Sequence, residues 1–215
     1  MPFLRRLLFP AIASFWLLAH ETAMAHLPLY GVGSASRIIF KEDRILITFD
    51  LSYADIWAQG EMLAADVNKS SSVESDEAAA YVERQWKEKI APRLKAKLDG
   101  KDMPVRKAAE RHEGLVGEIY GVPFSLYYEL EVDVPGGSPG AGGEHTFELD
   151  DTVVRDETPA KPQFFVPYEG QGDPGRSIFQ PEFLEPDPAS VQLDPASQSH
   201  YATGQRLAVK YRFEA

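Results

Sequence analysis

The chain has 215 residues, with 22 basic and 33 acidic side chains, a formal net charge of −11, 44% hydrophobic residues and no cysteine. This composition excludes a disordered chain and a multi-span membrane protein. The acidic balance disfavours nucleic acid as a partner and favours cations. The lack of cysteine excludes disulfides, thiolate catalysis and cysteine-type metal sites, so the fold must be held by its core, alone or with a bound metal.

The first 25 residues have the parts of a secretory signal. Two arginines come first, followed by an apolar run over 7–18 and a small-x-small cleavage pattern that ends at Ala25. The run is shorter than the ~20 residues that span a bilayer, so we expect a cleaved signal peptide over 1–25 rather than an anchor. We expect residues 26–215 to form a single exported domain, periplasmic or secreted, without a transmembrane segment.

The first part of the mature chain predicts a hairpin followed by two helices, because the spacing of its apolar residues changes from two to about four. Ser75 starts the second helix with a capping oxygen and acidic neighbours, and Pro92 ends it. The predicted elements here are strands at 37–41 and 44–51 and helices at 54–65 and 75–91.

The rest of the chain returns to strand patterns. The clearest is 122–134, where apolar residues alternate with polar ones, so that half of the strand should face water. The Pro-rich segment 167–203 is expected to be an ordered wrap over one face. The other predicted strands are 94–98, 145–149, 153–155, 163–166 and 205–213. These elements predict an α+β fold, a mostly antiparallel β-sandwich-like domain with a helix–loop–helix inserted at about 54–92.

The segment between the two helices matches a 12-residue EF-hand calcium loop that begins at Asp66. Val73 is the apolar residue at position 8, which pins such loops to a core, and Glu74 at position 9 can act through water. A hard divalent cation takes six to eight oxygens from one tight loop. The predicted metal ligands are the side chains of Asp66, Asn68 and Ser70, the backbone carbonyl of Ser72, and Glu77.

Position 6 of the loop departs from the motif, because Ser71 stands where glycine is usual. The turn there needs a positive φ, which costs a residue with a Cβ of order 1 kcal/mol. We therefore expect weak calcium binding, with a Kd of roughly 10⁻⁴ to 10⁻³ M, or a loop that has kept its shape without the metal. A serine-rich connector with capping residues is the alternative interpretation. No second loop is visible, although EF-hand loops usually come in pairs.

Four stretches, "AHLPLYG", "RILITFDLSYADI", "GEMLAADVNKSSSVESDEAAAYVERQWKEKI" and "LKAKLDGKDMPVR", resemble the extracytoplasmic domain of nickel/cobalt exporter-like (NicO/RcnA-type and HupE-like) bacterial proteins. "EHTFELDD" is similar to a strand of those domains, and the resemblance covers 26–168. It implies a metal role and an envelope or membrane protein as partner. This chain differs by Ser71 and by lacking a membrane segment after the domain, so transport is not implied.

An alternative metal site uses His26, which would become the N-terminal residue after cleavage. Its amine and ring, with one more histidine, can hold copper as in copper-dependent monooxygenases and copper carriers, and nickel is a related candidate. The other histidines are expected to be structural or exposed: His112 in a turn, His145 at a strand start and His200 in a polar loop. This makes a copper or nickel accessory protein the second hypothesis, with oxidase-type activity as its enzymatic form.

The sequence contains no nucleophile elbow, P-loop, dinucleotide fingerprint or HExxH helix. The adjacent acids Asp150 and Asp151 could serve glycoside chemistry, but neighbouring residues on a strand point apart, so a solvated surface is expected. Exposed Tyr127 and Trp57 could stack on sugars in a structural or carbohydrate-binding sandwich, although burial is commoner. The leading hypothesis is an exported, non-enzymatic protein that binds calcium weakly, for stability or for docking a partner.

Overall fold

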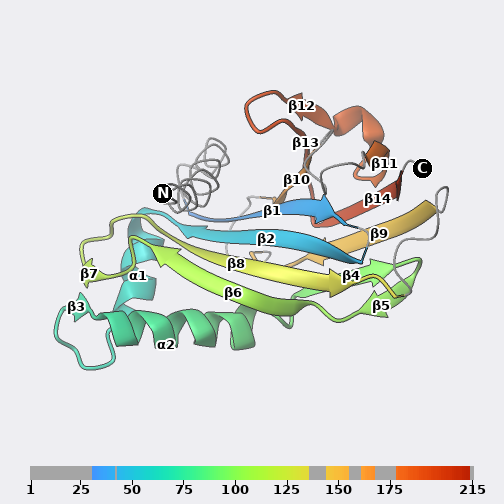
Figure 1. Ribbon diagram of the computed structural model, residues 1–215. Helices are drawn as coiled ribbons and strands as arrows, with labels where there is room; N and C mark the ends of the chain where they lie inside the picture. The colour runs from blue at the N-terminus through green and yellow to red at the C-terminus, as the bar shows by residue number, and fades with distance from the viewer. Residues whose placement is uncertain (1–30, 42, 136–143, 155–160, 168–177, 214–215) are drawn as a thin grey trace, which may run out of the picture.

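The computed structural model describes residues 31–41, 43–135, 144–154, 161–167 and 178–213 (Figure 1). It is an α+β fold of mostly antiparallel sheets with two helices, which confirms the predicted fold class. The predicted signal peptide and His26 lie outside the described residues. The strands are β1 (Val32–Phe40), β2 (Arg44–Tyr53), β3 (Ser72–Val73), β4 (Leu94–Leu98), β5 (Lys101–Met103), β6 (Arg106–Glu113), β7 (Gly117–Glu118), β8 (Phe124–Asp133), β9 (Glu144–Asp151), β10 (Gln163–Pro167), β11 (Ile178–Glu185), β12 (Gln192–Asp194), β13 (Ser199–Thr203) and β14 (Arg206–Phe213).

Two sheets form the body of the molecule. The larger has seven strands in the order β12-β13-β10-β1-β2-β8-β6, and the smaller has five in the order β11-β14-β9-β4-β5. Within the larger sheet β1 and β10 are parallel, and the other neighbouring strands are antiparallel. The predicted hairpin is present as β1 and β2, which pair from Val32 and Tyr53 to Phe40 and Ile45.

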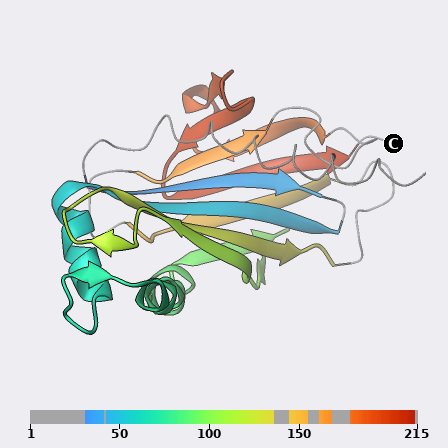
Figure 2. The same cartoon turned by 60° about the vertical axis from the view of Figure 1, so that its left-hand side comes forward.

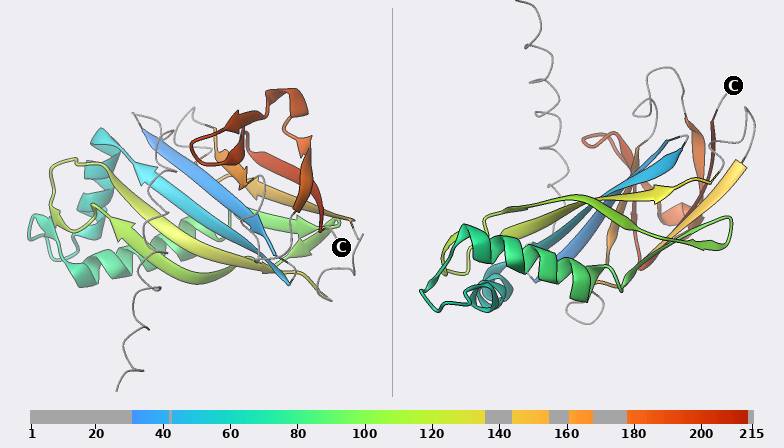
Figure 3. Two further views of the ribbon diagram at one scale, coloured as in Figure 1. Left: turned by 45° about the horizontal axis from the view of Figure 1, so that its top comes forward. Right: turned by 60° about the horizontal axis from the view of Figure 1, so that its bottom comes forward.

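The helices are α1 (Asp55–Ala65) and α2 (Ser75–Gln85), and a π-helical turn (Trp86–Ile90) extends α2. Both helices were predicted from their apolar spacing. Figure 3 shows α2 lying along the side of β6 and β8. There Trp86 packs against Tyr128 with ring centroids 5.7 Å apart, and Tyr81 meets Phe124 edge-on at 6.4 Å.

The core lies under one face of the seven-stranded sheet. The helices cover part of this face, and the five-stranded sheet covers the rest. Phe40 of β1 stacks on Tyr211 of β14 at 4.1 Å and meets Phe147 of β9 edge-on at 5.8 Å. On β2 the alternate residues from Ile45 to Tyr53 are buried, as their period of two requires. Burial of apolar side chains of this kind is the main favourable contribution to the stability of a fold.

Several local expectations are wrong. Val153 and Val154 are buried in a turn rather than a strand, and Arg155 lies outside the described residues. His112 lies within β6 opposite Leu126, so it is not a turn residue. Strand β6 was not predicted, because most of its side chains are exposed and polar and its sequence has no apolar alternation.

The segment expected as a wrap has more regular structure than the sequence indicates. It contains β11, β12, β13 and a 3-10 turn (Pro188–Ser190), and β13 pairs with both β10 and β12. His200 lies on β13 opposite Val166 and Leu193, so it is not in a polar loop. Pro-rich composition hides these strands, because proline is usual in turns and at sheet edges rather than inside strands.

Candidate functional site

The predicted calcium loop joins the end of α1 to the start of α2. The backbone N–H of Asp66 closes the last turn of α1 by donating to the carbonyl of Met62 at 3.0 Å. Helix α2 begins at Ser75 as predicted, but Glu74 rather than Ser75 occupies the N-cap position. The Glu77 carboxylate accepts a hydrogen bond from the Glu74 N–H at 3.1 Å, so this acid belongs both to the loop and to the first turn of α2.

The first half of the loop folds around Asp66, whose two carboxylate oxygens accept hydrogen bonds from successive backbone amides. The N–H of Ser70 donates to Oδ1 at 3.0 Å, and that of Ser71 donates to Oδ2 at 2.9 Å. The Ser70 N–H also reaches Oδ1 of Asn68 at 2.8 Å. The side chains at positions 1 and 3 are therefore directed at the same loop amide, which brings their oxygens to the inside of the turn.

The last ligand position is turned toward the same side. Oε1 of Glu77 accepts hydrogen bonds from the backbone N–H groups of Val67 at 2.9 Å and Asn68 at 3.0 Å. The carboxylate at position 12 thus reaches back across the loop to positions 2 and 3. Among the described residues no basic side chain pairs with Asp66 or Glu77, so these two charges are held only by neutral donors.

The loop backbone takes the conformation that the calcium motif requires at position 6. Ser71 has φ of 70°, although it carries a Cβ, and Lys69 at position 4 has φ of 59°. Each residue in this left-handed region costs about 1 kcal/mol relative to glycine. Because the hydrogen bonds to Asp66 come from the amides that this turn directs inward, the carboxylate offsets part of the cost.

The centre of the loop is anchored to the fold by a short strand pair. Val73 at position 8 is buried in the core, as expected. Strand β3 pairs with β7, placing Ser72 opposite Glu118 and Val73 opposite Gly117. Figure 2 shows this two-stranded ribbon beside α1, at one end of the larger sheet.

The five predicted ligand residues therefore lie around one turn, and their donor chemistry suits a hard cation. Two carboxylates, an amide oxygen, a hydroxyl and a carbonyl are present. The Ser70 hydroxyl donates to the carbonyl of Ser72 at 3.0 Å, so two of these oxygens now contact each other. Each oxygen of Asp66 accepts one amide, whereas Oε1 of Glu77 accepts two. A cation that used this oxygen would have to displace amide hydrogen bonds.

Other candidate residues are not gathered into a site. No group of three or more histidine, aspartate or glutamate side chains in the described ranges is arranged to hold a metal ion. His145 lies at the start of β9, and its Nδ1 is 2.7 Å from Oδ2 of Asp99. Trp57 is 43% exposed on α1, but Tyr127 is only 8% exposed, contrary to the expectation of an exposed stacking ring.

Of the pair Asp150 and Asp151, one acid does not lie on the solvated surface that the sequence predicts. Asp151 is fully buried between the sheets, where its Oδ2 accepts a hydrogen bond from the Ser34 hydroxyl at 2.7 Å and its Oδ1 accepts one from the Val153 N–H at 3.0 Å. Burial raises the pKa of this carboxyl. Alternation along β9 was the available signal, because Asp151 shares the inward face of Leu149.

A comparison with models of known protein families finds no match for this chain, and a comparison with curated proteins finds none either. Within the described residues, neither helix is long and apolar enough to cross a membrane.

Proposed function

We propose that this chain is an exported, non-enzymatic protein whose loop between α1 and α2 binds calcium weakly, for structural stability or for docking an envelope partner. The observation that carries the proposal is the conformation of the loop. Asp66 and Glu77 turn their carboxylates inward, Ser71 takes the positive φ of position 6, and Val73 is buried at position 8. Export is inferred from the signal-like pattern over 1–25.

Weak affinity follows from the hydrogen bonds within the loop. Calcium would take oxygens that backbone amides now occupy, most of all Oε1 of Glu77, which accepts from both Val67 and Asn68. Only two of the predicted metal ligands, Asp66 and Glu77, carry charge. The number of charged ligands is one of the properties that set calcium affinity in such loops. A Kd of roughly 10⁻⁴ to 10⁻³ M is therefore expected, which suits compartments with abundant calcium.

Calcium would act by joining the two helices. Asp66 follows the last residue of α1, and Glu77 lies in the first turn of α2. The helices are already linked by a hydrogen bond between Tyr81 and Glu61, and the Arg84 side chain donates to the Ala64 carbonyl at 3.0 Å. Calcium would add a tie at the loop end of this pair. Its benefit should appear as resistance to unfolding rather than as a new fold.

The test is a calcium titration by calorimetry on the chelator-treated mature protein and two variants. Glu77→Gln removes the bidentate ligand but leaves an amide that can still accept loop N–H bonds. Asp76→Asn removes the same charge one residue earlier, on an exposed side chain outside the ligand set. We expect saturable one-site binding in the wild type and in Asp76→Asn, and none in Glu77→Gln.

Equal calcium binding by all three proteins would contradict the proposal, as would the absence of calcium binding by the wild type. The same sample would then be titrated with copper and nickel, after mass spectrometry has shown whether His26 is the first residue. Any residue before His26 would remove the terminal amine that the copper site needs.

A further inference from the structure

Helix α1 exposes apolar side chains on the face that is turned away from the core. Its buried face consists of Ala58, Met62 and Ala65, which are spaced as in an amphipathic helix. On the outer face Ile56 is 76% exposed and Leu63 is 59% exposed. A surface helix normally places polar residues there, whereas a helix that is apolar all round is buried. The outer face of α1 therefore has the composition of a contact surface.

The exposed apolar side chains are concentrated at this end of the molecule. Nine large hydrophobic side chains are exposed among the described residues, and all but Leu184 and Leu193, that is seven, lie in the segments 56–67 and 116–122. The second segment contains β7, which Figure 2 shows beside α1. Single exposed apolar residues are normal on a protein surface, but a cluster marks an interaction site.

The outer face of α1 is also uncharged after its first residue, Asp55, in a chain whose net charge is −11. The other acid of the helix, Glu61, is turned toward α2. There its Oε1 lies 3.7 Å from Nζ of Lys89, and its Oε2 accepts a hydrogen bond from Nε2 of Gln85 at 3.3 Å. Two copies of an acidic chain repel each other over most of their surface. An uncharged face is where they can meet at the least cost.

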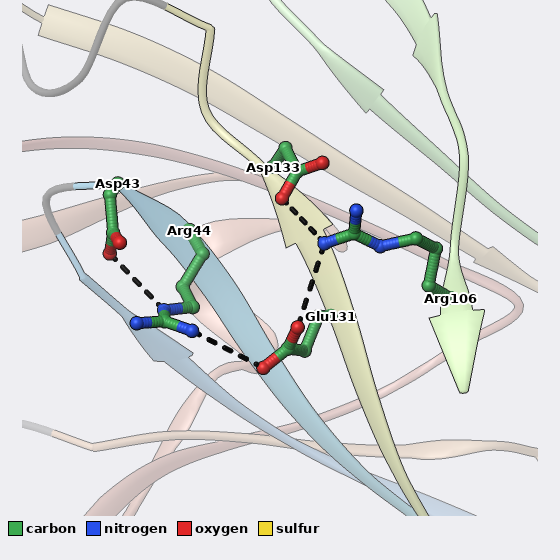
Figure 4. A network of polar contacts seen from close by, with 5 residues as sticks. All are labelled: Asp43, Arg44, Arg106, Glu131 and Asp133. Atoms are coloured by element: carbon green, nitrogen blue, oxygen red, sulfur yellow. Dashed lines mark hydrogen bonds and ion pairs between the residues drawn. The ribbon is translucent and has the colours of Figure 1, made fainter. Parts of the chain in front are cut away.

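Other parts of the surface are covered by charged side chains. Figure 4 shows a network of five of them, from β2, β6, β8 and the turn before β2. In this network the Arg106 guanidinium is 2.6 Å from Asp133 and 3.5 Å from Glu131. Burial of such a network against another protein would remove water from several charges, which is costly. Burial of the apolar face of α1 has no such cost.

Gly60 lies in the middle of the outer face, where no described residue accounts for it. A Cβ at this position would meet no atom within 4 Å, so no packing contact in the chain requires glycine. Glycine inside a helix is destabilising relative to alanine. It suits a position at which another backbone approaches closely. We therefore expect that approach to come from another molecule.

The sequence around Gly60 matches itself in an antiparallel helix pair. In two copies of α1 that cross with a two-fold axis at Gly60, positions at equal distances before and after this residue face each other. Trp57 of one copy then lies opposite Leu63 of the second copy. Ile56 lies opposite Ala64 in the same way, so large apolar side chains meet apolar or small ones. The two glycines allow the helix axes to come close.

We propose that the outer face of α1 is the interface of a weak, two-fold symmetric dimer of this chain, in which the two α1 helices pack antiparallel and cross at Gly60. The helix has 11 residues and is therefore roughly 16 Å long, so the interface is small. A Kd of about 10–100 μM is expected. The dimer does not depend on calcium binding by the loop.

Sedimentation equilibrium of the mature protein, with chelator present, measures the association up to a concentration of about 1 mM. We expect a monomer–dimer equilibrium that tightens at high salt, because screening weakens the repulsion between two acidic copies. A monomer at every concentration would overturn the proposal, as would a dimer that dissociates at high salt. Binding of such a monomer to neutral phosphatidylcholine vesicles would assign the face to a lipid surface instead.

A matched pair of substitutions locates the interface. Leu63→Gln and Leu193→Gln make the same change at two exposed positions, on α1 and on β12, where Leu193 is 65% exposed. The first should weaken dimerisation at least about tenfold and the second less than about twofold. Ile56→Gln replaces Leu63→Gln if that variant does not fold by circular dichroism. Equal Kd values for the α1 and β12 variants would overturn the proposal.

The crossing point is tested with an introduced thiol, since the chain has no cysteine. In the two-fold dimer Gly60→Cys brings two thiols together at the axis, within reach of a disulfide. Under mild oxidation this variant should form a covalent dimer at least about tenfold faster than Leu193→Cys. Equal rates of cross-linking in the two variants would show that the copies do not meet at Gly60.

Discussion

Carboxylates in two regions of this molecule accept hydrogen bonds from neutral donors, with opposite consequences. In the loop, Asp66 and Glu77 accept backbone amides, and the carboxylate at position 12 belongs to a side chain that solvent still reaches. Between the sheets, Asp151 accepts the Ser34 hydroxyl and the Val153 amide, and none of it is exposed. The donor types are similar, so solvent access is the main difference between Glu77 and Asp151.

That difference determines what each carboxylate can do. Burial disfavours the charged form and raises the pKa of Asp151, so this group acts as a structural acceptor that joins β1 to β9. Of the loop acids, Glu77 is only partly buried, so in our proposal it is the one that exchanges an amide for a cation most readily, whereas Asp66 is 8% exposed. Carboxylates can therefore differ in role according to where the fold places them: Asp151 is structural, and we propose that Glu77 is a ligand.

The largest expected effect concerns the buried acid. Asp151→Ala leaves the Ser34 hydroxyl and the Val153 amide without their acceptor, so the free energy of unfolding should fall by about 3 kcal/mol. Asp150→Ala is the matched control. The Asp150 carboxylate is partly exposed, and its ion pair with the exposed Arg206, at 3.6 Å, should contribute little to stability. Urea unfolding measures both. Equal losses in the two variants would remove the distinction between the regions.

A further carboxyl, on β2, tests the effect of burial by its pH dependence. Burial is the main cause that raises the pKa of Asp50 to about 6 from its usual 3.8, while the Ser52 hydroxyl bond and Arg111 act against it. The folded state therefore holds this proton more tightly than the unfolded state. Its stabilising contribution is full below about pH 4 and falls as pH rises toward and past 6, by up to about 3 kcal/mol.

Asp50→Asn has no such proton, so its stability relative to wild type should rise between pH 4 and pH 7. Urea unfolding of both proteins across this range measures the difference. Asp133→Asn, an exposed acid on β8, should follow the wild-type trend much more closely. A difference between wild type and Asp50→Asn that stays constant with pH would show that Asp50 titrates normally.

Calcium should have a smaller effect on the loop. For a Kd near 1 mM, 10 mM calcium should raise the free energy of unfolding by about 1.4 kcal/mol, and chelator should reverse this. Thermal unfolding with and without calcium measures the change, which Glu77→Gln should abolish and Asp76→Asn should keep. An equal gain with magnesium at the same concentration would indicate a general salt effect.

The smallest expected effect concerns backbone strain. Ser71→Gly relieves the positive φ at position 6, so it should stabilise the protein by about 1 kcal/mol. Ser72→Gly is the control, because that residue lies in β3 and gains nothing from glycine. If both substitutions lower the unfolding temperature equally, the loop conformation described here is wrong.

Strong periodicity made much of this fold predictable. The alternation of β2 and β8 and the four-residue spacing of α2 lie in continuous segments whose apolar faces meet the core. Strand β6 has no such pattern, since its side chains are mostly polar and exposed. The outward face of β8 also differed from expectation, because Ser125 and Tyr127 are buried rather than facing water.

The loop and the buried Asp151 differ in how much the sequence could predict of them. The loop was predicted because its residues lie within twelve positions and their spacing carries the geometry. Asp151 was misplaced because the sheet that covers it could not be inferred from the sequence.

The most direct test of the calcium loop follows the backbone amides by NMR during a calcium titration of the mature protein. The amides of Val67 and Asn68 donate to Glu77, so they should shift saturably as calcium replaces them, together with the amide of Ser71. The amides of β2, such as Phe49, should not move. Saturable shifts confined to the loop and the nearby ends of α1 and α2 are the result expected. Loop amides that stay unchanged at 10 mM calcium would contradict the account.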